Sequence, residues 1–178
     1  MQSSTLIGNP QDLFEAKVSA LVAKRALPEV VGYIVKKRGP KKAEQDLRDI
    51  GAHIARRMLM VWTPKHFKPF QLVKEAMRDF FGNTKIKGKI IERFKGKTSK
   101  IVIRDYDCPL CPERTKEELE ITEIHYCVAI SGFLEAIFDH LIKNRLVPFS
   151  KIRCKTIESV GSGHSHCEHV LEMEYGVR

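Results

Sequence analysis

The sequence has no long apolar run and no segment that directs a protein into a membrane. It nowhere approaches the roughly 20 consecutive apolar residues that a membrane-spanning helix requires. Its first residues, from Met1 to Gly8, lack the basic stretch followed by apolar residues that begins a secretory signal peptide. We therefore expect a cytoplasmic protein.

Motifs that hold nucleotides or catalytic metals are also absent. The sequence has no P-loop, no glycine-rich dinucleotide turn and no zinc-protease motif. His125 and Cys127 stand two positions apart, and residues at that spacing do not face each other on a helix. We expect no catalytic residues and no enzymatic activity.

Length and composition are typical of one globular domain. The 178 residues are 43% hydrophobic and 30% charged, which is a globular composition and long enough for a real core. We see no internal repeat, linker or low-complexity stretch. The expected domain spans residues 1–178, with its core at about residues 11–176.

The formal net charge of +9 is concentrated in basic runs at residues 36–38, 41–42 and 85–100. These runs are typical of a solvated face, and they also allow attraction to an anionic membrane surface. No helix-turn-helix or base-stacking motif accompanies them, so we do not expect a nucleic-acid partner.

Four helices are expected in the first half of the chain, at residues 9–22, 28–38, 41–62 and 69–81. Proline or glycine marks most of their boundaries. The third helix has the clearest apolar stripe, which is expected to face the core. That stripe consists of Leu47, Ile50, Gly51, Ile54, Met58 and Val61.

The second half alternates between strands and one helix. Residues 86–94 and 99–106 read as one hairpin, and residues 150–158 and 167–175 as another. Residues 126–143 form a strong helical pattern between them, with small residues at Ala129, Gly132 and Ala136 that allow another element to approach closely. Residues 117–124 are ambiguous. Helices segregated against a small antiparallel sheet make the expected fold class α+β.

The five cysteines suggest a metal site, because cytoplasmic proteins rarely contain disulfide frameworks. Cys108 and Cys111 have the spacing with which two thiolates chelate one tetrahedral zinc ion. The other three cysteines are scattered along the chain. Three interpretations stay open: structural zinc, inert core thiols, and redox or catalytic thiols.

Three segments carry a resemblance to known families. Residues 49–57, which read DIGAHIARR, and the helix that ends at Phe80-Phe81-Gly82 resemble the helical half of TRAPP vesicle-tethering subunits. Residues 126–135, YCVAISGFLE, resemble a helix of 4-vinyl reductase-type, hydrocarbon-binding domains. Residues 161–168, GSGHSHCE, resemble the turn that closes those domains. The resemblance implies a domain that dimerises through helices.

The resemblance also implies zinc ligands, because the sensory relatives bind structural zinc with one helix cysteine and with hairpin residues. It matches Cys127 and Cys167 directly, whereas Ser159 stands where those relatives have a cysteine. Cys154 or Glu158 could take the vacant ligand positions. The predicted ligands are Cys108, Cys111, Cys127, Cys154 and Cys167.

The sequence departs from the families at two further points. Ala136 replaces a second helix glycine. Some tethering subunits carry an acylated cysteine in their helical half, but no cysteine precedes Cys108 here, so we expect no lipid at that position.

Two functions are compatible with this reading. The first is a domain that binds a small apolar molecule between its long helices and its sheet. The alternative is a TRAPP-like scaffold, present as a homodimer or as a hetero-oligomer with a related chain. A reductase accessory role rests on the family name alone.

Overall fold

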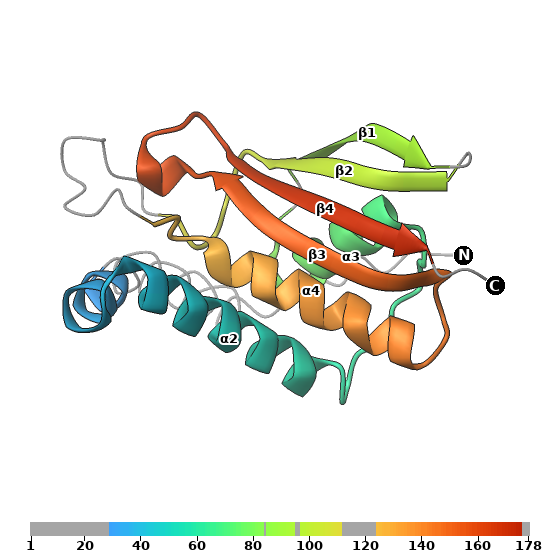
Figure 1. The fold of residues 1–178 in the computed structure, drawn as a ribbon, viewed down its shortest axis with the longest axis horizontal. Coiled ribbons are helices and arrows are strands. Elements are labelled where there is room, and N and C mark those ends of the chain that lie inside the picture. The colour runs from blue at the N-terminus through green and yellow to red at the C-terminus, as the bar shows by residue number, and fades with distance from the viewer. Residues whose placement is uncertain (1–28, 84, 95–96, 112–123, 176–178) are drawn as a thin grey trace, which may run out of the picture.

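The computed structural model describes residues 29–83, 85–94, 97–111 and 124–175. It confirms the α+β class, with helices packed on one face of a four-stranded sheet (Figure 1). The helices are α2 (Pro40–Met58), α3 (Pro69–Phe81) and α4 (Val128–Lys143), with a 3₁₀ turn, η2 (Val160–Ser162). The strands are β1 (Ile86–Phe94), β2 (Lys97–Asp105), β3 (Phe149–Glu158) and β4 (Cys167–Tyr175).

Most predicted boundaries agree with these elements to within two residues. Residues 29–38 are helical, as expected, and Gly39 separates them from α2 by adopting a positive φ of 75°. The helix expected at residues 9–22 lies outside the described residues, as does nearly all of the ambiguous segment 117–124. No described helix is long and apolar enough to cross a membrane.

The sheet joins the two predicted hairpins into one antiparallel unit. Its strand order is β1-β2-β4-β3, so β2 and β4 are the central strands and pair with each other. Along β4, Cys167, His169, Leu171 and Met173 are buried on the helix side. The alternation expected from the sequence therefore sets the inner face of this strand.

Helix α4 lies between the sheet and α2 and is the most deeply buried helix of the fold (Figure 1). Its predicted apolar face is buried as expected, because it packs on the strands. Small residues on the other side let α2 come close. The buried apolar side chains of α4 are Val128, Ile130, Phe133, Leu134, Ile137, Phe138 and Leu141.

Two glycines set the distance between α2 and α4. A Cβ atom at Gly132 would overlap the backbone carbonyl of Arg48, and one at Gly51 would overlap that of Ala129. Because the obstructing atoms belong to backbone, no side-chain rotation can relieve either overlap. The small side chains within residues 126–143 predicted the close approach of another element, and that element is α2, which packs against α4.

The stripe predicted for α2 is only partly correct. Leu47 and Gly51 are buried, but Ile50 and Ile54 are 46% and 41% exposed, and the helix ends at Met58 and not at Trp62. The physical reason is the close crossing: α4 covers a strip of α2 that is narrower than its apolar stripe. Two large apolar side chains remain beside that strip in solvent.

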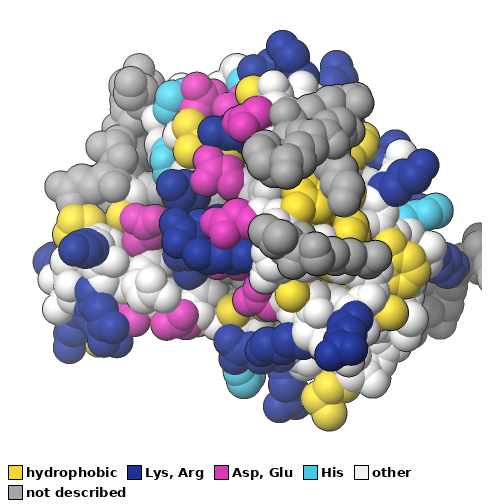
Figure 2. Space-filling model, turned by 45° about the vertical axis from the view of Figure 1, so that its right-hand side comes forward, with side chains coloured by type: hydrophobic (Ala, Val, Ile, Leu, Met, Phe, Trp, Pro, Cys, Tyr) yellow, Lys and Arg dark blue, Asp and Glu magenta, His cyan; other side chains and the backbone are white. Residues whose placement is uncertain are grey.

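The basic surface is interspersed with acidic side chains. Figure 2 shows Lys and Arg next to Asp and Glu over one face of the molecule. Lys100 lies 3.0 Å from Glu172, Lys85 lies 3.3 Å from Asp107, and Arg38 lies 3.0 Å from Asp46. Lys42 also lies 3.8 Å from Asp46, so each predicted basic run has a member paired with a carboxylate.

The helix crossing can be tested by adding one methyl group. Gly132→Ala is expected to lower the free energy of unfolding by about 3 kcal/mol, because the overlap with α2 can be relieved only by moving backbone. Chemical denaturation followed by circular dichroism measures the change. Ala52→Ser is the control, since Ala52 lies in the open groove beside the crossing, and it should cost less than about 1 kcal/mol. A fully stable Gly132→Ala protein would refute the crossing.

Candidate metal centre

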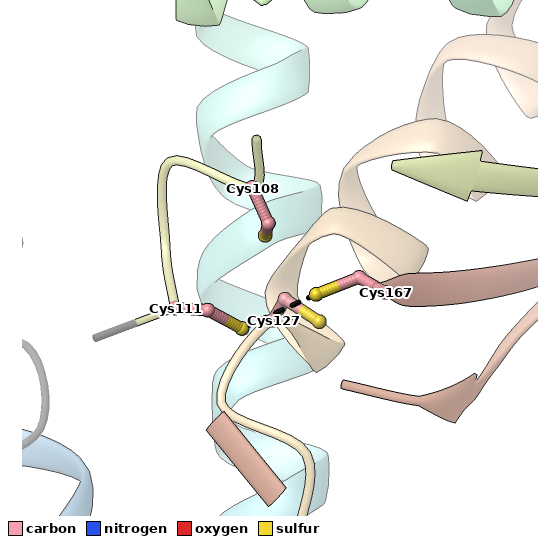
Figure 3. A group of neighbouring side chains, drawn as sticks. All are labelled: Cys108, Cys111, Cys127 and Cys167. Carbon is pink, nitrogen blue, oxygen red and sulfur yellow. Dashed lines mark hydrogen bonds between the residues drawn. The ribbon is translucent and has the colours of Figure 1, made fainter. Parts of the chain in front are cut away.

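Four of the five predicted cysteines meet at one end of the sheet. The sulfur atoms of Cys108, Cys111, Cys127 and Cys167 all lie within 4.8 Å of one another. Figure 3 shows their side chains converging from a loop, a helix start and a strand start. We call these four residues the cysteine cluster.

Local structure explains how each thiol reaches the cluster. Cys108 and Cys111 lie in a tight turn after β2, closed by a hydrogen bond of 3.4 Å from the Cys111 amide to the Cys108 carbonyl. Cys127 is the N-cap residue of α4, and Cys167 is the first residue of β4. Segments about 60 residues apart in the sequence, counting from Cys108 to Cys167, are thereby brought together.

The sulfur positions fit a four-coordinate metal better than a disulfide. Sγ of Cys111 lies 3.3 Å from Sγ of Cys167, whereas a disulfide bond is about 2.05 Å long. Four thiolates at about 2.3 Å from one zinc ion lie roughly 3.8 Å apart. The described cysteines are all free. Four converging thiols are a donor set that would suit one tetrahedral metal ion.

Hydrogen-bond donors at the cluster favour negative charge on Cys111 and Cys167. Hydrogen bonds from Cys108 and the other cluster thiols hold the pKa of Cys111 well below its usual range. The amide of Val160 lies 3.4 Å from Sγ of Cys167 and donates to it. Cys127 sits at the N-terminus of α4, where the helix dipole favours an anion. These donors would support thiolate ligands.

The pKa values of two other cluster thiols, Cys108 and Cys127, are shifted upward, opposite to that of Cys111. The hydrogen bond with Cys111 is the main cause that raises the pKa of Cys108, and hydrogen bonds within the cluster also raise that of Cys127. All four residues are buried, and none is more than 6% exposed. A metal ion held here would have a complete shell of protein ligands and no open position, which suits a structural role and not a catalytic one.

Cys154 is not part of the cluster, although the sequence placed it among the ligands. It pairs with Leu171 in the sheet, four residues along β4 from Cys167, which corresponds to about 13 Å. Burial raises the pKa of its thiol to about 12, so it stays neutral. Its spacing from Cys167 could not be known before the register of the last hairpin was fixed.

The backbone of Cys154 instead belongs to a polar network that joins α2, α4 and β3. Arg48 donates to the Cys154 carbonyl at 2.9 Å and forms an ion pair with Glu135. Glu135 in turn accepts a hydrogen bond of 3.1 Å from the Cys154 amide. This network lies beside the glycine crossing and fixes the tilt of both helices against the strand.

Glu158, which was also considered as a ligand, and Ser159, which stands where the relatives have a cysteine, both lie outside the cluster. Ser159 is buried and its hydroxyl lies 3.2 Å from Nδ1 of His125 and 2.7 Å from the hydroxyl of Ser162. These contacts tie η2 to the segment that enters α4. In this chain the Cys108-x-x-Cys111 turn brings two thiols to the cluster, whereas the last hairpin contributes only Cys167.

Glu158 belongs to a second group that the sequence analysis did not identify. Its carboxylate lies near His166 and Glu168, and one ligand atom from each of the three falls within 4.8 Å of the others. Strand alternation offered a signal, because His166 and Glu168 flank the inward-pointing Cys167 and must point outward together. Their meeting with Glu158 depends on the strand pairing.

Comparisons with known proteins address the fold. No protein-family model matches the chain, and no curated protein matches it. A solved structure of trafficking protein particle complex subunit 3 from Naegleria fowleri, covalently bound to palmitic acid, is similar with a TM-score of 0.66. The likeness covers 91% of this chain and 99% of that one, at 14% sequence identity. The chain has a TRAPP-like fold.

A second solved structure has a related architecture. The phenol-responsive sensory domain of the transcription activator PoxR, solved with phenol, is similar with a TM-score of 0.57 at 14% identity. The likeness covers 84% of this chain and 74% of that one. Neither similarity supports the resemblance to 4-vinyl reductase-type domains, which stays a prediction.

Proposed function

We propose that this chain is a non-catalytic binding subunit that pairs with a second copy of itself through α2 and is held together by a structural zinc ion. The observation that carries the proposal is the pair of exposed isoleucines on α2, Ile50 and Ile54. The TRAPP-like fold supports it, since one structural neighbour is a subunit of a trafficking complex.

The exposed flank of α2 has the chemistry of a self-complementary contact. Ile50 and Ile54 lie one helical turn apart and so form a short apolar ridge. Asp49 and Arg57 are exposed and lie four residues on either side of His53. An antiparallel two-fold pairing centred near His53 would set Asp49 of each copy opposite Arg57 of the other. Such isologous contacts are the commonest in oligomers.

The pairing predicts a dimer that one charge can disrupt. Light scattering over a micromolar concentration series should give twice the chain mass of 20.4 kDa. Ile54→Lys should give the monomer mass, because the two-fold axis brings two buried ammonium groups together. The fold should be retained, since Ile54 is exposed in the single chain.

Ile90→Lys is the matched control, because Ile90 is 45% exposed on the edge strand β1 and away from α2. It should leave the dimer intact. A monomeric wild-type chain at every concentration, or an Ile54→Lys dimer, would refute pairing through α2.

Zinc is the ion that the cysteine cluster fits best. Four soft thiolates in a buried, closed shell are the ligand set of structural zinc sites. The ion would join the turn after β2 to the starts of α4 and β4, and would therefore couple metal binding to folding. The other interpretations, inert core thiols and redox or catalytic thiols, do not by themselves account for the convergence of four sulfur atoms within 4.8 Å of one another.

Zinc loss should destabilise the protein. Protein purified without chelator is expected to hold about one zinc per chain at the cluster, and removing it should lower the melting temperature by more than about 10 °C. Cys127→Ser and Cys167→Ser should each reproduce both effects. Cys154→Ser is the control, because Cys154 is equally buried but outside the cluster, and it should keep the zinc. If the purified protein holds no metal and its melting temperature is unchanged in chelator, the zinc site is rejected and the five cysteines are buried thiols without a metal.

Binding of a small apolar molecule is the second candidate function. The cluster of buried core side chains includes residues of α4 and of the strands, and Phe80 and Phe81 at the end of α3 both contact Phe133 of α4 edge to face. A surface groove of about 580 Å³ next to this core has an apolar lining and a basic rim. Its lining includes Phe67, Pro69, Pro148, Phe149 and Tyr175, with Lys65 and Lys68 among the other residues.

This second function can be tested with two probes. Titration calorimetry with phenol and with palmitate should show binding that Phe67→Ala weakens about tenfold, the effect of losing part of an aromatic contact. Phe67 is 42% exposed, so its removal should not unfold the protein. Ile90→Ala again serves as the control. Absence of heat with both probes would leave partner binding as the proposed function.

Attraction to an anionic membrane is supported less well. The members of the basic runs that pair with Asp46, Asp107 and Glu172 have part of their charge compensated within the protein. Exposed pairs of this kind are typical of a solvated face.

A further inference from the structure

We propose that Glu158, His166 and Glu168 form a second metal site, which binds an exchangeable first-row transition-metal dication on the outer side of the sheet. This site is separate from the cysteine cluster and does not depend on it. The proposal rests on three ligand atoms that converge and on a buried imidazole nitrogen that faces two carboxylates.

The last hairpin places these side chains together. Glu158 at the end of β3 pairs with Glu168 on β4, so both carboxylates project from neighbouring strands. His166 directly precedes β4. Its Nε2 atom lies 3.6 Å from Oε2 of Glu158 and 3.6 Å from Oε2 of Glu168. The three residues are therefore ordered by backbone pairing and not by flexible loops alone.

The separations suit ligands of one ion better than direct hydrogen bonds. A nitrogen–oxygen hydrogen bond is about 2.9 Å long, so 3.6 Å is too far. Two ligand atoms each about 2.1 Å from a tetrahedral ion lie roughly 3.4 Å apart. Within the described part of the chain, Nε2 of His166 is buried and has no hydrogen-bond partner. A buried polar atom without a hydrogen bond costs free energy, which either an ion pair with the two carboxylates at 3.6 Å or a bound metal ion would recover.

The ring of His166 is held in a position to ligate. Its Nδ1 lies 3.0 Å from the hydroxyl of Ser165. When Nδ1 donates its proton there, Nε2 carries the lone pair that a metal needs, which is how neighbouring groups orient metal-bound histidines. Tyr106 stacks on the ring with centroids 5.4 Å apart, which limits its rotation. Only 14% of the side chain is exposed.

The charges around the group leave room for a dication. Arg104 donates to Oε2 of Glu168 at 2.9 Å, and this orients the carboxylate while cancelling part of its charge. His164 adds a further nitrogen, with Nδ1 3.8 Å from Oε2 of Glu158. The two carboxylates, Glu158 and Glu168, thus outnumber the one guanidinium, Arg104.

The ligand types select the class of ion. Imidazole with carboxylates suits zinc, cobalt, manganese or iron, whereas calcium and magnesium prefer oxygen ligands only. Glu158 is 36% exposed, so the site opens to solvent, unlike the cysteine cluster. Three protein ligands would leave at least one coordination position to water. An ion here should exchange with solution.

Strand alternation accounts for two metal sites at one point of the sheet. Cys167 points inward to the cluster, while His166 and Glu168 on either side of it point outward. The inner site would be closed and structural, and the outer one accessible. An ion in the outer site would join the ends of β3 and β4 across the η2 turn.

The test is titration calorimetry with Zn²⁺ on the full chain, after zinc that survives desalting has been counted. Wild-type protein should bind one further Zn²⁺ with micromolar or better affinity, and the same sites should take Co²⁺ but not Ca²⁺ or Mg²⁺. His166→Gln and Glu158→Gln should each weaken this second binding event by more than about tenfold. Both variants should keep the zinc that survives desalting.

Matched controls are His140→Gln and Glu174→Gln, which remove exposed residues of the same types outside the group. They should bind the second ion like wild type. Glu158→Gln keeps the test decisive if His166→Gln fails to fold. The proposal is overturned if wild-type protein binds no exchangeable Zn²⁺, or if both site variants bind it as tightly as the controls. If the wild-type protein retains no zinc after desalting but still binds one exchangeable Zn²⁺, the result counts against zinc in the cysteine cluster and not against this second site.

Discussion

The close contact between α2 and α4 is the constraint on which the rest of the structure depends. Gly51 and Gly132 let the two helix backbones approach until each blocks the space where the other would carry a Cβ atom. With α2 on one side and the sheet on the other, α4 is buried around most of its circumference. The same contact covers only part of the apolar stripe of α2, and this leaves Ile50 and Ile54 exposed.

Strand pairing in the sheet determines which side chains of the two candidate metal sites come together. Pairing of β2 with β4 puts Asp105 opposite Cys167, so the cysteine turn that follows β2 lies at the start of β4. Pairing of β3 with β4 puts Glu158 opposite Glu168 on the outer face. One strand therefore contributes to a buried all-sulfur group on one side and to an accessible nitrogen and oxygen group on the other. If both groups hold metal ions as proposed, the buried one would serve stability and the accessible one exchangeable binding.

The fold of this chain does not by itself determine its function. A TRAPP-like fold describes how helices and sheet are arranged, and proteins with one fold serve different functions. The two structural neighbours illustrate this, since one is a trafficking subunit and the other a phenol-responsive sensory domain. The proposal of partner binding rests on the surface of this chain itself: exposed isoleucines on α2, beside a groove along α4 that is lined by both charged and uncharged residues.

The sequence by itself determined the elements that depend on local spacing. Helical periodicity located α3 and α4, strand alternation located both hairpins, and the Cys108-x-x-Cys111 spacing identified half of the cysteine cluster. Tertiary structure alone decided which cysteines meet. Cys154 on β3 pairs with Leu171 on β4, and this register places it four residues along the sheet from Cys167. Tertiary structure also decided that Ile50 and Ile54 are exposed and that Glu158 meets His166. These outcomes depend on distances between segments that no local pattern encodes.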